Sequence, residues 1–134
     1  MRNTKTVIIQ AEGRDFGKSY ILTELSAMKA EKWAARALLA LLKSGLQVPD
    51  EIAQAGLGGV AALGMNAFAN LSFESAEPLL DEMMTCVQFV SSSGSVRPLS
   101  EAASDIEEVK TLWILRQEVL ELHLGFSIAD KLST

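Results

Sequence analysis

The sequence predicts a mostly α-helical domain of about four to five helices, of the all-α class, with a short β-hairpin at its N-terminal end. Apolar residues make up 49% of the 134 residues but aromatic residues only 6%, so the core is expected to be aliphatic. Apolar residues recur at helical spacing over two long segments, 27–44 and 105–124. A chain of this length suits one domain, which we expect to span residues 1–134.

Two β-branched segments predict the hairpin, over residues 6–25. The segments 6–10 and 19–25 have the composition of strands, and the segment 12–17 between them is turn-like, with two glycines. Two strands alone are marginally stable in water. The hairpin is therefore expected to pack on an apolar surface of the helical body, residues 26–132.

The strongest helix pattern covers residues 27–44. Ser26 suits its N-cap, and Gly45 suits the position just after its C-terminal end. The residues expected on its buried face are Trp33, Ala34, Ala37, Leu38, Leu41 and Leu42.

The middle of the chain predicts shorter helices. Ser75 suits the N-cap of a helix over about residues 76–87, with Pro78 in its first turn. Met83 and Met84 on this helix suit either the core or an adaptable binding surface. Residues 91–99 are expected to form a flexible loop. Two further short helices are expected at about 50–55 and 60–71.

A capping box predicts the last long helix. Ser104 and Glu107 have the required spacing, so the helix is expected to span 105–124 and to end at Gly125. The residues expected to supply its core face are Ile106, Val109, Leu112, Trp113, Val119 and Leu120.

Charge and cysteine content exclude several classes of protein. A net charge of −5 and a pI near 4.9 argue against nucleic acid as a partner, because proteins that bind phosphate backbones are usually basic. Cys86 is the only cysteine, so no intrachain disulfide is expected. Residues 1–5 are not expected to begin a signal peptide. The stretch 53–71 is rich in Ala and Gly and predicts a buried helix, so no membrane partner is expected.

No catalytic, cofactor-binding or metal-binding residue is expected, and the chain is not predicted to be an enzyme. The segment 13–19, GRDFGKS, resembles a P-loop but has three residues between its glycines instead of four, and a strand-like segment follows it. We interpret it as a hairpin turn. His123 has no second histidine to complete a metal site, and the carboxylates cluster at helix starts, where acids are common.

A basic stripe runs along the helix predicted at 27–44. The basic residues of this stripe recur at a period near 3.6. The stripe therefore suits either a solvated face or a surface that docks to an acidic partner. With one neighbouring aromatic residue it forms the hypothesised partner-binding set: Lys29, Lys32, Trp33, Arg36 and Lys43.

Three segments resemble the tail assembly chaperones of long-tailed (siphovirus-like) bacteriophages and prophages. They are YILTELSAMKAEKWAARALLALLKSG (20–45), EPLLDEMMTCV (77–87) and DIEEVKTLWILRQEVLELHLGFS (105–127). In that family a short β segment leads into a helix that contains A-E-K-W/L-A-x-R-A-L. The resemblance covers most of the chain, from about residue 16 onwards, and consists of successive helical patterns rather than of a fixed site.

This resemblance implies a late phage protein that acts in the bacterial host cytoplasm and is absent from the mature virion. It implies binding to the tape measure protein, which the chaperone keeps soluble while the tail tube assembles around it. In many such phages a translational frameshift adds a C-terminal extension that recruits the tail tube protein. The resemblance implies that this chain would be the unextended product, and the sequence leaves open whether a longer product exists.

Other classes stay open. A virion structural adaptor, such as a head–tail connector or neck component, has the same size and helical character. A small transcriptional regulator fits the acidic balance less well. The sequence also leaves open whether the chain associates with itself.

Overall fold

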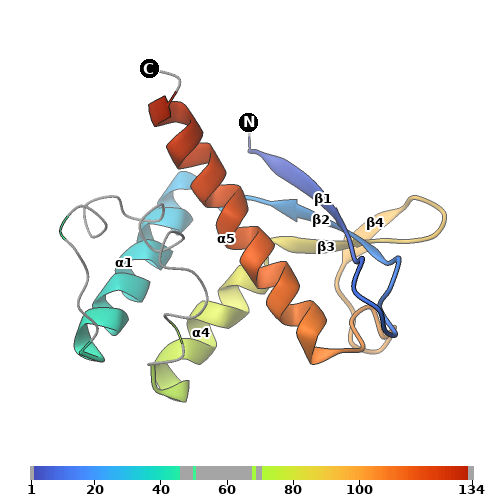
Figure 1. The fold of residues 1–134 in the computed structure, drawn as a ribbon, viewed down its shortest axis with the longest axis horizontal. Coiled ribbons are helices and arrows are strands. Elements are labelled where there is room, and N and C mark those ends of the chain that lie inside the picture. Colours follow the sequence, from blue (N-terminus) through green and yellow to red (C-terminus); the bar gives the residue numbers. More distant parts are fainter. Residues whose placement is uncertain (1, 46–49, 51–67, 69–70, 133–134) are drawn as a thin grey trace.

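The computed structural model describes residues 2–45, 50, 68 and 71–132, with side chains up to residue 123. Within these ranges, three helices lie against a four-stranded antiparallel sheet (Figure 1), so the fold is α+β. The elements are β1 (Thr4–Ile8), β2 (Ser19–Thr23), α1 (Ala27–Lys43), α4 (Phe73–Met84), β3 (Val87–Val90), β4 (Val96–Pro98) and α5 (Val109–Leu132). The predicted mostly helical, all-α fold is wrong. The helices expected at 50–55 and 60–71 lie almost wholly outside the described residues.

The predicted N-terminal hairpin is confirmed. β1 and β2 pair antiparallel, with Val7 opposite Tyr20. The side chains of Tyr20 and Leu22 point into the core and are fully buried, as the alternation of a half-buried strand requires. The chain turns back with Gly17 at φ 83°, a left-handed conformation that glycine adopts without strain.

The second hairpin explains why the fold class was wrong. β3 pairs with β2, placing Phe89 opposite Tyr20, and β4 pairs with β3, so the sheet has the order β1-β2-β3-β4. The segment expected as a flexible loop, 91–99, therefore contains a turn followed by a strand. Strands of four and three residues are too short for periodicity to reveal. β3 is stabilised by pairing with β2, a segment distant in sequence, and β4 is stabilised by pairing with β3.

The bounds of helix α1 match the prediction, but Leu42, expected on its buried face, is 49% exposed. Helix α4 begins and ends earlier than expected. The hydroxyl of Ser26 accepts a hydrogen bond from the N–H of Lys29, and Gly45 has φ 94°, as a C-terminal glycine should. In α4 the N-cap is Ser72, whose Oγ accepts from the N–H of Ser75 at 3.3 Å. Pro78 consequently lies inside the helix rather than in its first turn.

Helix α5 begins at Val109 and continues to Leu132, so the bounds predicted as 105–124 are wrong at both ends. Gly125 does not stop the helix. Ser104 has φ 56°, which is incompatible with the extended conformation of an N-cap, so the predicted capping box is absent. The N–H of Glu107 instead donates to the carboxylate of Asp15, which lies in the distant β1–β2 loop.

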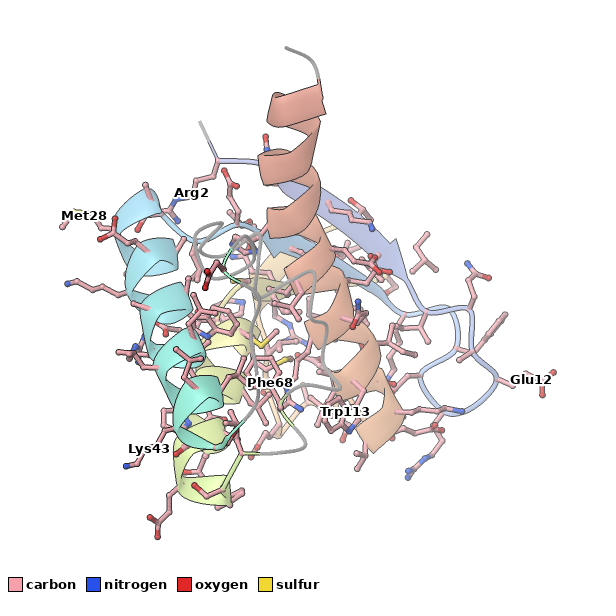
Figure 2. The ribbon with its side chains drawn as sticks, turned by 60° about the vertical axis from the view of Figure 1, so that its left-hand side comes forward. Arg2, Glu12, Met28, Lys43, Phe68 and Trp113 are labelled. Atoms are coloured by element: carbon pink, nitrogen blue, oxygen red, sulfur yellow. The ribbon has the colours of Figure 1, made fainter. Side chains whose placement is uncertain are left out.

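The core lies between the sheet and the three helices. Trp33 of α1 is only 1% exposed, its Nε1–H donates to the Leu79 carbonyl at 3.0 Å, and its ring centroid lies 6.1 Å from that of Phe68. Figure 2 labels Phe68, which lies between α1 and α5 in this view. Two residues expected in the core of α5 lie outside it, since Val109 is 70% and Trp113 45% exposed. The long α5 crosses one face of the sheet, with α4 and α1 beside it (Figure 1). No helix among the described residues is both long and apolar enough to span a membrane.

Candidate functional site

The P-loop-like segment 13–19 is a hairpin turn docked onto the start of α5. The carboxylate of Asp15 is 1% exposed and accepts hydrogen bonds from the N–H groups of Glu107 and Glu108 at 3.0 Å. It also accepts from the hydroxyl of Thr111 at 2.6 Å. Asp15 thus satisfies the free N–H groups before a helix that has no cap of its own. The interpretation as a turn is confirmed.

Lys18, the counterpart of a P-loop lysine, is engaged by carboxylates. Its Nζ lies 2.9 Å from Asp15 and 3.3 Å from Glu107, and it donates to the Ser104 carbonyl at 2.9 Å. Burial raises the pKa of Asp15, but hydrogen bonds from Thr111, Lys18 and the backbone outweigh it and lower this pKa to about 2. A phosphate at this helix start would have to displace an ionised carboxylate, so the segment serves the fold.

A second polar cluster fixes the connection between β4 and α5. Both terminal nitrogens of Arg97 donate to the carboxylate of Asp105 at 2.6 Å, and the N–H of Ser100 adds a bond of 2.7 Å. The hydroxyl of Tyr20 donates to the Asp105 carbonyl at 2.6 Å. Hydrogen bonding from Arg97 lowers the pKa of Asp105. This bidentate pair holds the connection against the sheet.

His123 is a buried structural residue. Its Nδ1 lies 2.8 Å from the Val119 carbonyl, and its Nε2 lies 3.0 Å from the N–H of Leu25. A carbonyl only accepts and an N–H only donates, so this geometry requires the neutral ring with its proton on Nδ1. Both nitrogens are therefore used within the fold.

The other candidate reactive group is also buried. Desolvation raises the pKa of the Cys86 thiol to about 11, with a smaller contribution from Glu82, so the thiolate form is rare at neutral pH. Where the structure describes side chains, no three His, Cys, Asp or Glu groups are placed to hold a metal ion.

The hypothesised partner-binding set does not form one surface. Lys29, Lys32, Arg36 and Lys43 are exposed on α1, but Trp33 points into the core and cannot touch a partner. Arg36 forms an ion pair with Glu82 of α4, so it already joins two helices of the same chain. The three lysines form no ion pair with any described residue.

An open groove lies between α4, the β4–α5 connection and α5. We call it the α4–α5 groove; its volume is about 380 Å³. A second hollow of about 420 Å³ continues it past Met84 and Leu99 towards β3. The residues that line the groove are Asp81, Met84, Leu99, Ser100, Glu101, Asp105, Ile106, Leu112 and Arg116. The apolar members are half-buried, so they offer an adaptable surface to an apolar ligand.

Arg116 is the unusual member of this groove. Its Nε is buried and has no hydrogen-bond partner in the structure. Desolvation lowers the pKa of its guanidinium, although Asp81 acts in the opposite direction. The guanidinium carbon lies 5.8 Å from the centre of the Trp113 ring, within range of a cation–π contact.

Sequence reasoning missed the groove because its walls come from three separate segments. Met84 was recognised as suited to binding, but Leu99 and Ile106 lie in a connection that no periodicity describes. A single arginine on an amphipathic helix usually lies on a solvated face. Only the packing of α4 beside α5 makes Arg116 part of a pocket.

No protein-family model matches the chain, and no curated protein or solved structure matches it significantly. The geometry of the groove and the resemblance described above are therefore the basis for a functional proposal.

Proposed function

We propose that this chain is a binding protein that acts as a phage tail assembly chaperone and uses the α4–α5 groove to hold the tape measure protein. The observation that carries the proposal is the open groove with half-buried apolar walls, Met84, Leu99, Ile106 and Leu112. The resemblance of segments 20–45, 77–87 and 105–127 to such chaperones supplies the partner.

The physical requirements of this task suit such a surface. A tape measure protein is long and has apolar helical stretches, so it aggregates when these stretches are exposed to water. An apolar groove that accepts an amphipathic helix covers one such stretch. The net charge of −5 keeps the resulting complex away from neutrality and so favours its solubility.

The proposed place of action is the host cytoplasm, with release before the virion is complete. An open groove suits a contact that must later be broken, because its hydrogen bonds and apolar contacts stay accessible to a competing partner. The exposed lysines of α1, Lys29 and Lys32, are a second proposed contact, without Trp33.

Co-expression with the tape measure protein encoded in the same genome tests the proposal. Soluble tape measure protein should rise several-fold with the wild-type chain and should fall to the background level with Leu112→Glu, which places a charge in the groove. The matched control is Ile8→Glu, since Ile8 is 51% exposed on β1 and belongs neither to the groove nor to α1. Circular dichroism spectra should show that both variants are folded.

Three outcomes are decisive. If the wild-type chain leaves the tape measure protein insoluble, the chaperone proposal is wrong. Detection of the chain in purified virions by mass spectrometry would favour a structural adaptor instead. Loss of binding in Lys29→Glu/Lys32→Glu but not in Leu112→Glu would move the contact from the groove to α1.

A further inference from the structure

Among the residues that the structure describes, the Nε of Arg116 in the α4–α5 groove has no hydrogen-bond partner. Arg116 follows Leu112 by one helical turn on α5, so both side chains face the same groove. Its Nε is buried. A guanidinium stays charged at any physiological pH and offers five N–H donors. Within the described part of the chain, the groove therefore contains a cationic side chain with an unsatisfied donor beside its apolar wall.

The acids around the groove do not satisfy this donor. The carboxylate of Asp105 already accepts two hydrogen bonds of 2.6 Å from Arg97. Asp81 lines the groove but forms no ion pair with Arg116, and Glu101 is exposed at its edge. Leaving a partly buried charge unpaired is costly for the free protein. A partner that brings a carboxylate to the terminal nitrogens of Arg116, rather than to its buried Nε, offsets part of that cost.

We propose that Arg116 is the specificity-determining residue of the groove and that it binds one carboxylate from an otherwise apolar segment of the tape measure protein. The planar guanidinium matches a carboxylate in a two-bond geometry, and the Trp113 ring supports it from the side. The apolar side chains of the segment then lie on Met84, Leu99 and Leu112. This inference rests on the proposed function and adds the chemistry that the groove selects.

Charge decides which occupant fits. Asp81 and Glu101 repel a segment with several acids, so the groove favours a single carboxylate flanked by apolar or basic residues. A second copy of this chain carries the same net charge of −5, which opposes self-association through the groove. A segment of a different protein is therefore the better occupant.

Overlapping peptides from the tape measure protein of the same genome are the probe. Peptides of about 20 residues are long enough to form a helix that spans the groove. Fluorescence anisotropy should identify at least one that binds the wild-type chain and contains an Asp or Glu. Arg116→Met should weaken its binding by about 30-fold or more, because it removes one partner of a buried charge pair. Arg2→Met, the matched loss of an exposed arginine outside the groove, should leave the affinity unchanged.

A double-mutant cycle identifies the carboxylate. Replacing the critical Asp or Glu of the peptide by Asn or Gln should weaken binding to the wild-type chain as much as Arg116→Met does. The same replacement should have little further effect on the Arg116→Met variant, because the contact is already lost.

Thermal stability separates this role from a structural one. Arg116→Met should melt at the same temperature as the wild type or higher, because it replaces an unpaired charge by an apolar chain of similar length. A melting temperature clearly below that of the wild type would show that Arg116 supports the fold, and would contradict the inference.

Three further outcomes would contradict the inference, and they distinguish its failure from failure of the proposed function. If the wild type and Arg116→Met solubilise the tape measure protein and bind its peptides equally well, the chaperone function stands and the role of Arg116 is wrong. If the wild type neither solubilises the protein nor binds any peptide, both proposals fail. A wild-type dimer that Arg116→Met converts to a monomer in sedimentation equilibrium would assign the groove to a second copy.

Discussion

At the scale of single residues, the buried polar groups of this protein serve the fold. Asp15, Asp105 and His123 are all buried. Asp15 and His123 each accept a hydrogen bond from a backbone N–H group of a distant segment, and Asp105 accepts one from Ser100 in its own connection. When a buried polar group loses its partner, the free energy of unfolding falls by more than the net contribution of the hydrogen bond. These residues should therefore be sensitive to changes that leave their size intact.

The carboxylate of Asp15 should make stability fall in acid. Its pKa is about 2 in the folded protein against an ordinary 3.8, which corresponds to about 2 kcal/mol of stability. Because the folded-state pKa is the lower one, this stability is fully present above about pH 4. It is lost as the pH falls from about 4 to about 2.

Urea unfolding of the wild type and Asp15→Asn over this pH range measures the contribution. The variant should be less stable by about 2 kcal/mol at neutral pH, and the difference should shrink towards pH 2. Asp105 and Glu108 also have lowered pKa values, but their effects are common to both proteins and cancel in the difference. A difference that does not depend on pH would contradict the assignment.

His123 should contribute through its acceptor nitrogen. His123→Phe leaves the N–H of Leu25 without a partner and should cost about 1–3 kcal/mol of unfolding free energy. His123→Gln keeps an acceptor on a flexible chain and should cost less. Chemical denaturation of the two variants gives the comparison, and an equal loss would show that ring packing, rather than the hydrogen bond, is what matters.

At the scale of elements, the start of α5 depends on the β1–β2 loop. Asp15 of this loop accepts hydrogen bonds from the N–H groups of Glu107 and Glu108. In the other direction, the carboxylate of Glu108 accepts a hydrogen bond of 2.6 Å from the N–H of Arg14. Lys110 also donates to the Glu12 carbonyl. Helix α5 and the first hairpin therefore stabilise each other, although about 90 residues separate them in sequence.

Gly13 should be the most sensitive position of this loop. It has φ 145°, and a Cβ added there would overlap the carboxylate of Glu108. Gly13→Ala should therefore strain the backbone and push Glu108 away from Arg14. Gly94→Ala is the matched control, because Gly94 has φ 88° but open space around the added atom.

Thermal unfolding should rank the two glycine variants. Gly94→Ala should cost about 1–2 kcal/mol, the strain of a left-handed residue alone. Gly13→Ala should cost more, since the contact with α5 is also lost. Equal losses would show that the loop adapts to Ala without moving Glu108.

At the scale of the whole molecule, strand pairing positions the segments that form the α4–α5 groove. Pairing of β3 with β2 sets the end of α4, and the β4–α5 connection returns past it to α5. Arg97 and Asp105 then fix this connection beside α4. The groove that these three segments form is open to solvent.

The sequence by itself determined the first hairpin and helix α1. Local interactions decide both: the cap at Ser26, the glycine at position 45 and the apolar period between them are all encoded within one segment. The P-loop-like turn was also recognisable, because its glycine spacing is a local property.

Only the tertiary structure decided the second hairpin, the start of α5 and the α4–α5 groove. β3 and β4 are too short to be recognised alone. β3 forms because β2 offers its free edge, and β4 then pairs with β3. The predicted capping box failed because Asp15, distant in sequence, took the N–H of Glu107 in its place. Whether Arg116 is solvated or enclosed depends on which side chains surround it, and those come from segments that only folding brings together.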